Sequence, residues 1–431
     1  TFAPMVDISR DPRWGRVMEG AGEDPYLGSK IARARVEGFQ GKNLDAFNTI
    51  AATAKHFAAY GFAEAGKEYN KVDIGTVTLH NMVLPPFKAA NQAGVSTFMT
   101  GFNELNGIPV TGSEYLLRDL LKNKWGFQGF VISDWASIEE MVTHGYARDK
   151  ADAANKAVKA GVDMDMESSS FVDELIGLIQ TGAVREELID DAVRRILKVK
   201  FLLGLFDDPY KYCDAERELQ TIGSEENRKA VLDMAKKSIV LLKNENNLLP
   251  LKKNGQKIAV IGPLADDSNS VLGSWRIASE DSSGVSIVEG LKQYTGNELI
   301  FKKGADLITN KPTFINELEF NTTDKRGFEE ALSAAKAADV VIMVLGEHGF
   351  QSGEGRSRTQ LDLPGVQQEL MEEVFKVNKN CVLVLNNGRP LAIEWAAEHI
   401  PSIVEAWHLG TETGNAVAQV LYGDYNPSGK L

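Results

Sequence analysis

The first half of the chain repeats one pattern, a short apolar run followed by an amphipathic stretch long enough to form a helix. Strands that alternate with helices of about 10–15 residues are typical of βα units, in which the strands lie parallel. Five apolar runs fit this description, at residues 2–8, 52–57, 95–101, 129–133 and 162–166. A TIM-type barrel has eight such strands, so the pattern predicts an incomplete barrel of the α/β class.

Helical periodicity fills the spaces between these runs, most clearly at residues 26–41, 79–93 and 113–125. A longer amphipathic stretch at 185–203 closes the region, and Gly204 is a suitable helix stop. The following residues, 207–224, are polar and lack sustained periodicity, which is typical of a linker. We therefore assign residues 1–206 to the barrel domain and 207–224 to a linker.

The second half restarts with a predicted helix at residues 225–243. Apolar strands follow at residues 257–262, 340–345, 381–385 and 403–407, with helical segments between them. This order again predicts α/β structure, with an open sheet in place of a barrel. We expect residues 225–431 to form an α/β sandwich domain. The chain length of 431 residues agrees with two or three domains.

Composition excludes several classes of function. The formal net charge of −13 argues against a nucleic-acid partner, which requires a basic surface. No apolar run reaches the length of about 18 residues that a membrane helix needs. The strand at 257–262 is not followed by a GxGxxG motif, so we expect no nucleotide cofactor. The six histidines are scattered, and Cys213 and Cys381 form no CxxC pair, so we expect no metal site.

One carboxylate occupies a position that barrel enzymes use for catalysis. Asp134 ends the apolar run 131–133 and is followed by Trp135. Active sites of barrels form at the carboxyl ends of the strands, and an aromatic ring offers an apolar face to a sugar. The alternative is structural, because an Asp at this point could cap a helix predicted at 138–144.

Basic residues gather at two other strand ends. Lys55 and His56 close the run 52–57, and both side chains donate hydrogen bonds to hydroxyl groups. Arg16 belongs to an arginine-rich segment, 10–16, that interleaves with acidic residues after the first run. The guanidinium group of an arginine can donate hydrogen bonds to hydroxyl groups or hold a carboxylate in place. The structural alternatives are a surface lysine, a satisfied core histidine and an ion-pair cluster.

Two further acidic residues follow the predicted strand 340–345. Glu347 comes directly after it, and Glu354 lies between two glycines in a polar loop at 353–358. Loops at sheet ends often carry function because the scaffold holds them in place. The alternative is an ordinary flexible surface loop.

Taken in order along nearly the whole chain, these motifs resemble glycoside hydrolase family 3, particularly its periplasmic bacterial β-glucosidases with a two-domain core. The resemblance rests on the segments 10–16, 22–24, 55–57, 131–135, 238–244, 273–275, 353–358, 387–390 and 423–425. It implies that Asp134 is the nucleophile and that Glu354 is the general acid/base, with Glu347 as a nearby competitor. It also implies that Arg16, Lys55 and His56 bind the sugar, that Met99 lines the pocket, and that Trp135 and Trp275 flank the sugar.

The resemblance implies a retaining, exo-acting β-glucosidase, whose two carboxyl groups lie about 5–5.5 Å apart. Asp134 and Glu354 would then come together from two domains. β-Xylosidase or a broad β-glycosidase of the same family is the alternative. A β-N-acetylglucosaminidase is less consistent, because those enzymes typically lack a second domain. From a different class, a non-catalytic sugar-binding protein or an inactive fragment stays open.

The ends of the chain suggest a fragment. Thr1 lies inside an apolar run, and the family has a further sugar-binding Asp that we expect before Thr1 and a fibronectin-like domain that we expect after Leu431. The resemblance implies a periplasmic or extracellular location. We expect a small oligosaccharide or glucoside as substrate, tolerance toward different leaving groups, and a homodimer as the assembly to test first.

Overall fold

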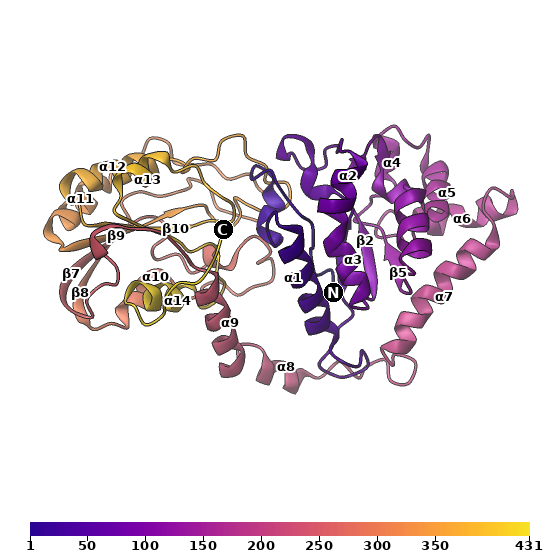
Figure 1. Cartoon of the computed structure of the whole chain (residues 1–431), viewed down its shortest axis with the longest axis horizontal. Coiled ribbons are helices and arrows are strands. Elements are labelled where there is room, and N and C mark those ends of the chain that lie inside the picture. The colour runs from indigo at the N-terminus through magenta and orange to yellow at the C-terminus, as the bar shows by residue number, and fades with distance from the viewer. The chain divides into compact units, whose positions relative to one another are not determined.

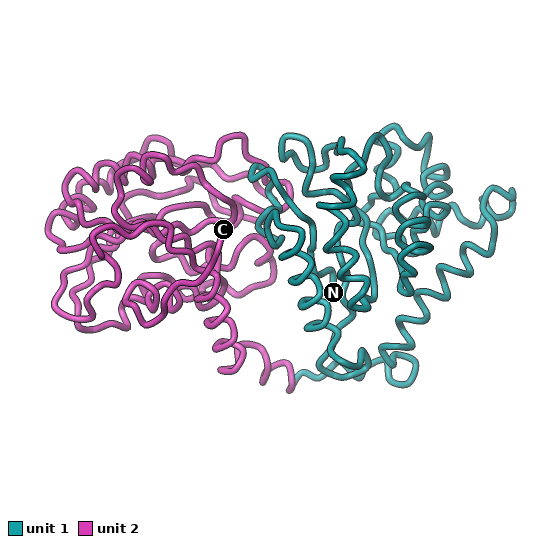
Figure 2. Tube along the Cα trace, in the orientation of Figure 1, with its two compact units in different colours: residues 1–215 teal, residues 216–431 magenta.

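The computed structural model describes all residues, 1–431, and divides into two compact units, Thr1–Ala215 and Glu216–Leu431 (Figure 2). The segment 207–224, expected to be a linker, contains one short helix, α8 (Ala215–Thr221), in which no residue is buried. None of the helices combines the length and apolar character that crossing a membrane requires.

Unit 1 is built around parallel strands that follow one another in chain order. The sheet contains β1 (Thr53–Phe57), β2 (Thr97–Thr100) and β5 (Phe130–Ile132), with β2 in the centre. Parallel bridges from Met5 to Lys55 and from Ile132 to Met164 add a segment on each side. All five predicted strand segments therefore lie side by side and parallel, and the prediction of a TIM-type first domain is confirmed.

Helices of unit 1 follow the predicted periodicity closely (Figure 1). Asp24 caps the first of them through the N–H groups of Tyr26 and Leu27. Phe57, Phe87 and Phe98 pack edge to face or tilted in the core. The helices are α1 (Pro25–Gln40), α2 (Thr76–Thr78), α3 (Leu84–Gln92), α4 (Glu140–Thr143), α5 (Lys150–Ala160), α6 (Ser170–Gln180) and α7 (Glu186–Leu202), with π-helical segments at Leu79–Val83 and Tyr115–Lys124 and a small hairpin of β3 (Glu104–Leu105) and β4 (Ile108–Pro109).

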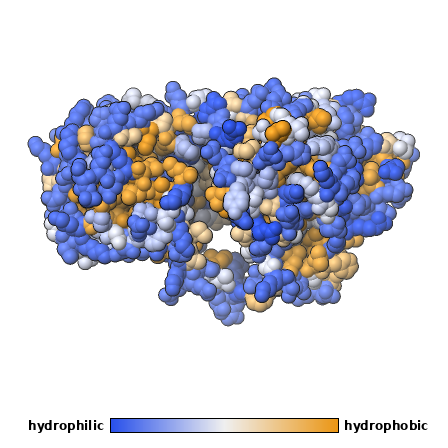
Figure 3. Space-filling view, viewed as in Figure 1, coloured by the Kyte–Doolittle hydropathy of each residue, from blue (hydrophilic) through white to orange (hydrophobic).

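The surface is mostly hydrophilic, with apolar patches that include one over the region of α7 (Figure 3). Val193, Leu197 and Phe201 are exposed there at intervals of four residues, which places them on one face of this helix.

Unit 2 is a six-stranded sheet in the order β6-β11-β10-β9-β7-β8. Its strands are parallel except for β6, which pairs antiparallel with β11. Residues alternate between two cores: Val340, Ile342 and Val344 face one, whereas Val341, Met343 and Leu345 face the other. Helices α9, α10 and α14 contribute to the first core, and α11, α12 and α13 to the second, so the predicted α/β sandwich is confirmed.

The strands of unit 2 are β6 (Val240–Asn244), β7 (Asn254–Ile261), β8 (Gly296–Lys302), β9 (Val340–Gly346), β10 (Cys381–Asn386) and β11 (Ser402–Glu405). Its longer helices are α9 (Glu225–Ser238), α10 (Ile287–Lys292), α11 (Phe328–Ala337), α12 (Gln367–Val377), α13 (Glu394–His399) and α14 (Thr413–Leu421).

In unit 2, two elements differ from the sequence-based prediction. The helix predicted at 225–243 is wrong in its last part, because α9 ends at Ser238 and the next residues form β6. Ile239 and Val240 are β-branched and apolar, residues that favour strands, and Val240 pairs with Glu405 of β11. The edge strand β8 was not predicted, since its sequence is half polar and none of its residues is fully buried.

Candidate active site

Asp134 lies just beyond the carboxyl end of β5 and is 8% exposed. Its Oδ1 accepts a hydrogen bond from the N–H of Trp135 at 2.7 Å, which fixes the carboxylate against its own backbone. The helix-cap alternative is wrong, because α4 begins only at Glu140 and its N-cap residue is Glu139. The structure therefore gives Asp134 no role in starting this helix.

The second oxygen of Asp134 faces a buried imidazole. The Nε2 atom of His56 lies 3.5 Å from Oδ2 of Asp134. On the other side of the ring, Nδ1 lies 2.9 Å from Oδ2 of Asp7, which also accepts the backbone N–H of His56 at 2.9 Å. Both side chains are 1% exposed. Asp7, His56 and Asp134 thus form a continuous carboxylate–imidazole–carboxylate series.

Burial dominates the electrostatics of this series. It raises the pKa of Asp7 to about 7, against the smaller lowering effects of the His56 N–H and of Arg16. Burial also lowers the pKa of His56 well below its ordinary value, assisted by the positive charges of Arg16 and Lys55. A neutral imidazole whose Nδ1 faces one carboxylate presents a defined Nε2 atom to its other side.

Asp7 was missed in the sequence-based prediction. The family's additional carboxylate was expected before Thr1, and the acidic residue inside the run 2–8 received no weight. The signal was nevertheless present, since Asp7 near the end of a parallel strand segment follows the same logic that singled out Asp134.

Arg16 and Lys55 lie near His56 and act electrostatically on it. Arg16 is 1% exposed and forms an ion pair with Glu19, whose oxygen lies 2.8 Å from Nε. Its guanidinium lies 5.8 Å from the ring centre of Tyr60. Lys55 is half-buried on β1 and acts electrostatically on both Asp7 and His56. The structure therefore gathers Arg16, Lys55, His56 and Asp134 in one region of unit 1.

Met99 and Trp135 occupy different environments. Met99 is 1% exposed on the central strand β2, opposite Ile132 of β5. Trp135 is 62% exposed, so its ring offers a face to solvent or to a ligand. Met99 lies within β2, whereas Trp135 follows Asp134 in a turn that the N–H of Ser137 closes by donating to the carbonyl of Asp134.

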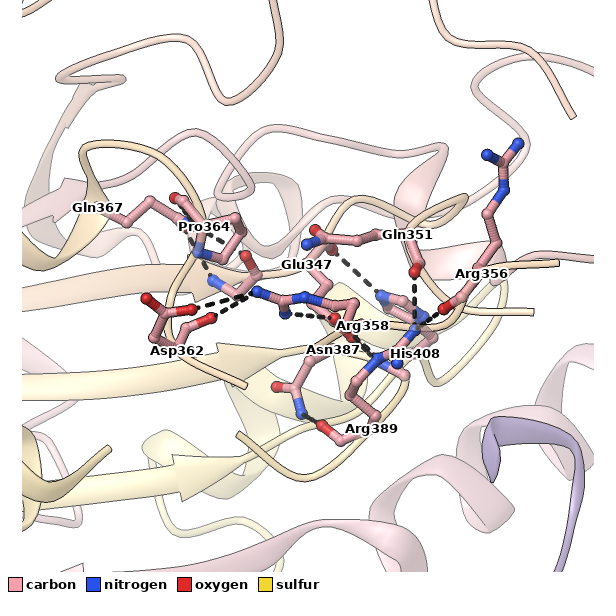
Figure 4. Close-up of polar contacts among 12 residues, drawn as sticks. Glu347, Gln351, Arg356, Arg358, Asp362, Pro364, Gln367, Asn387, Arg389 and His408 are labelled. Carbon is pink, nitrogen blue, oxygen red and sulfur yellow. Dashed lines mark hydrogen bonds and ion pairs between the residues drawn. The ribbon is translucent and has the colours of Figure 1, made fainter. Parts of the chain in front are cut away.

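In unit 2, Glu347 is completely buried, and two arginine side chains contact its carboxylate (Figure 4). Its Oε1 accepts a hydrogen bond from Nη1 of Arg358 at 2.8 Å and lies 3.0 Å from Nε of Arg389. Its Oε2 accepts the N–H of Gly388 at 3.2 Å. Two guanidinium groups and a backbone donor thus account for both oxygens of this carboxylate.

Glu354 is half-buried on the loop after β9. The N–H of Arg356 donates to the carbonyl of Gly353 at 3.2 Å, which closes a turn around Glu354. Arg389 holds both sides of the loop, because Nη2 donates to the carbonyls of Gln351 at 2.8 Å and Arg356 at 2.7 Å (Figure 4). The loop is therefore anchored to the buried ion-pair cluster.

Trp275 is 46% exposed and adjoins this loop through its neighbour Ser274. A Cβ atom added to Gly353 would lie 2.6 Å from the Cβ atom of Ser274, so the two segments are in direct contact. Glycine is required here for a second reason, since its φ is +109°. Unit 2 thus brings together the segments that carry Trp275 and Glu354.

Other buried titratable groups of unit 2 form no metal site, since no group of three or more His, Cys, Asp or Glu residues is placed to hold an ion. Burial lowers the pKa of His348 to about 4 and raises that of Glu405 to about 8. Glu405 accepts the N–H of Trp407 at 3.0 Å, which marks it as a support for the backbone after β11.

Comparison with known families matches both units. Residues 1–199 match the glycosyl hydrolase family 3 N-terminal domain, and residues 239–431 match the family 3 C-terminal domain. The chain belongs to glycoside hydrolase family 3. The two matches leave only the junction between the units uncovered, so the family-3 architecture extends over nearly the whole sequence.

Family-3 relatives include a periplasmic β-glucosidase of Salmonella typhimurium, 44% identical over all of this chain and 58% of its own length. A β-xylosidase of Formosa agariphila is 40% identical over all of this chain and 60% of its length. The crystal structure of a β-glucosidase from Listeria innocua in complex with isofagomine superposes with a TM-score of 0.93 at 39% identity, covering all of this chain and 58% of that one. The chain thus spans less than two thirds of these relatives.

Proposed function

We propose that the chain carries the catalytic core of a retaining, exo-acting β-glucosidase that hydrolyses terminal β-D-glucosyl residues. The observation that carries the proposal is the series Asp7–His56–Asp134 at the strand ends of a family-3 barrel domain. It presents a carboxylate of fixed orientation beside a buried imidazole and two cations. The relatives named β-glucosidases support glucose as the sugar.

In the first step, Asp134 attacks the anomeric carbon and the bond to the leaving oxygen breaks. Glu354 donates its proton to that oxygen, so the leaving group departs as a neutral alcohol and the sugar is held as an ester of Asp134. In the second step Glu354 takes a proton from water, which attacks the same carbon and releases the sugar and the Asp134 carboxylate.

Arg16, Lys55 and His56 would bind the hydroxyl groups of the reacting sugar. Their side chains supply several donors around one carboxylate. Asp7 would act on the sugar only through His56, by fixing the orientation of its ring. Met99 would contribute a wall of the pocket, and Trp135 and Trp275 would lie against the sugar faces.

β-Xylosidase activity is the second candidate, because a 40% identical relative carries that name. Xylose differs from glucose by the absence of the hydroxymethyl group at C5, so the two activities are separated by comparing kcat/KM for 4-nitrophenyl β-glucoside and β-xyloside. A larger value for the xyloside would reverse the assignment.

The proposed substrate and the proposed location also rest on similarity to the relatives. Structures of the Listeria innocua enzyme with glucose and of a variant with laminaribiose support a small oligosaccharide as substrate. The periplasmic relative supports a periplasmic location for the protein that contains this chain. A homodimer is a further prediction, which sedimentation velocity would test.

The test is covalent labelling with a 2-deoxy-2-fluoro-β-glucoside that carries a good leaving group. The fluorine slows the second step more than the first, so the ester accumulates and is found by intact mass and peptide mapping. We expect one adduct on the peptide that contains Asp134, and none in Asp134→Asn. An adduct on another carboxylate would refute the assignment of the nucleophile.

A further inference from the structure

Asp134 is the first residue of a strained turn. Ala136 has a φ of +54°, a left-handed backbone conformation that few residues other than glycine adopt. The N–H of Ser137 closes the turn by donating to the carbonyl of Asp134 at 3.1 Å. Because such a conformation costs free energy, it persists only where the surrounding contacts hold it in place. The contacts of this turn therefore determine the position of the backbone that carries the proposed nucleophile.

The next parallel segment of the chain supplies part of these contacts. The N–H of Ser133 donates to the carbonyl of Met164 at 2.9 Å, and the hydroxyl of Ser133 accepts the N–H of Met166 at 2.8 Å. The N–H of Ala136 donates to the carbonyl of Met166 at 3.0 Å. Two of these three hydrogen bonds join backbone groups alone, so this support depends little on the identity of the side chains.

Three buried hydroxyl groups connect the same turn to β2. They belong to Thr100, the last residue of β2, to Thr111 in the short turn Val110–Gly112, and to Ser137, and none of these residues is more than 3% exposed. We call them the hydroxyl cluster. Oγ1 of Thr111 lies 2.8 Å from Oγ1 of Thr100 and 3.1 Å from Oγ of Ser137. Oγ1 of Thr100 also accepts the N–H of Asp134 at 3.4 Å, so the cluster contacts both the first and the last residue of the turn.

One arrangement of protons satisfies the whole hydroxyl cluster. Thr111 donates to the carbonyl of Gly101 at 3.3 Å, which leaves both of its lone pairs to accept from Thr100 and Ser137. Thr100 then donates to Thr111 while it accepts the N–H of Asp134. A buried polar network whose members are all satisfied is rigid and specifies a single arrangement of its side chains. The cluster therefore joins the end of β2 rigidly to the turn of Asp134.

From this arrangement we propose that the hydroxyl cluster positions the nucleophile by fixing the strained turn that begins at Asp134. The inference rests on the proposed function, in which Asp134 must attack the anomeric carbon and later release it. Catalytic groups need to be held within about 0.5 Å of the productive geometry, and a displacement of about 1 Å can cost about 10²-fold in rate. All three hydroxyls are buried, so they act through the backbone of Asp134 and serve as positioning residues.

The same strand offers a matched control for a purely structural role. Thr97, at the other end of β2, is 5% exposed, and its Oγ1 lies 2.6 Å from Oγ1 of Thr53. Thr97→Val and Thr100→Val therefore remove the same kind of buried hydroxyl pair from the same strand. Of these two threonines, Thr100 is the one whose hydroxyl accepts the N–H of Asp134.

The test follows the rate at which 2,4-dinitrophenyl 2-deoxy-2-fluoro-β-D-glucoside labels the full chain. Measuring this rate at several concentrations separates the limiting rate of ester formation from the dissociation constant of the unreacted compound. We expect Thr100→Val and Ser137→Ala each to lower the limiting rate about two- to tenfold, the range of one hydrogen bond, with an unchanged dissociation constant. Thr100→Ser retains the hydroxyl and should recover the parent rate. Thr97→Val should label at the parent rate, although its melting temperature falls as that of Thr100→Val does.

Equal limiting rates in the parent chain, Thr100→Val and Ser137→Ala would overturn the positioning role, while an adduct on Asp134 would leave the proposed function standing. Equal slowing in Thr97→Val would assign the effect to stability and would also overturn the inference, as would a change confined to the dissociation constant. Ser137→Ala decides alone if Thr100→Val does not fold. Absence of an adduct on Asp134 in the parent chain would overturn the proposed function and this inference together.

Discussion

Replacing Glu347 by Gln should destabilise unit 2 strongly, although Glu347 lies only seven positions from the proposed acid/base. The substitution keeps the shape of the side chain but removes its charge. Arg389, which is completely buried, and Arg358, which is 15% exposed, would then lose the carboxylate that compensates them.

The size of the effect follows from this burial. Removing one partner of a buried ion pair typically costs about 3–5 kcal/mol, because the remaining charge stays away from water. For a unit of roughly 200 residues, each kcal/mol lowers the melting temperature by about 2–4 °C. We therefore expect the transition of unit 2 to move down by about 6–20 °C.

Scanning calorimetry measures this shift, and Glu317→Gln is the matched control. Glu317 also pairs with an arginine, Arg356, at 3.2 Å, but it is 89% exposed. An exposed pair contributes little, so its loss should move the transition by about a degree or two. A shift of the same small size for Glu347→Gln would refute the structural role that its three contacts indicate.

Further predictions concern the proposed catalytic groups and their supports. Glu354→Ala should lower kcat by about 10²–10⁴-fold for substrates with poor leaving groups; added azide should restore turnover and give β-glucosyl azide, whereas rescue of Glu347→Ala instead would exchange the two roles. Above pH 7, where Asp7 is ionised, Asp7→Asn should lower kcat/KM by roughly ten- to a hundredfold through the loss of a charged hydrogen bond to His56, and an unchanged value with Asp7→Glu and Asp7→Asn alike would remove Asp7 from the site. Burial raises the pKa of Asp7 from 3.8 to about 7, so between these pH values the folded chain retains a proton that the unfolded chain releases. The contribution of Asp7 to the free energy of unfolding is therefore fully present below pH 3.8 and falls as the pH rises to about 7. Urea titrations at pH 5 and pH 8 should show this fall in the parent chain and not in Asp7→Asn. Lys122→Met should cost about 3–5 kcal/mol in unit 1, since it leaves Asp163 buried without the ammonium 2.6 Å away, and Lys124→Met is the nearby control.

Most of the fold could be predicted from the sequence because its strands are buried on both faces. The residues of β9 and β10 are all buried, and such strands read as continuous apolar runs in any context. Edge strands lack that constraint. β8 exposes part of its sequence to water, and β6 follows a helix without a glycine or proline between them, so neither leaves a clear pattern.

The residues of the candidate site also differ in how readily the sequence identifies them. Lys55, His56 and Asp134 are found at or just beyond the ends of predicted strands, where the barrel architecture alone makes polar residues conspicuous. Asp7 has the same local signal, but recognising it requires knowing that the segment around Met5 pairs with Lys55 and so brings Asp7 to His56. That information lies 49 residues away in the sequence.

The choice between Glu347 and Glu354 is a case in which sequence position is the poorer guide. Glu347 directly follows a strand and would be the natural choice by the argument that identifies Asp134. The contacts of Arg389, on the loop after the neighbouring strand, support the proposed assignment of Glu354 instead. The same guanidinium lies against Glu347 and holds the carbonyls of Gln351 and Arg356, on either side of Glu354. The buried carboxylate therefore stabilises the arginine that positions the loop, and a group with that task cannot exchange protons in each turnover without releasing the loop. These contacts indicate that Glu347 anchors the loop, and they support the proposal that Glu354, which the anchored loop presents, is the general acid/base.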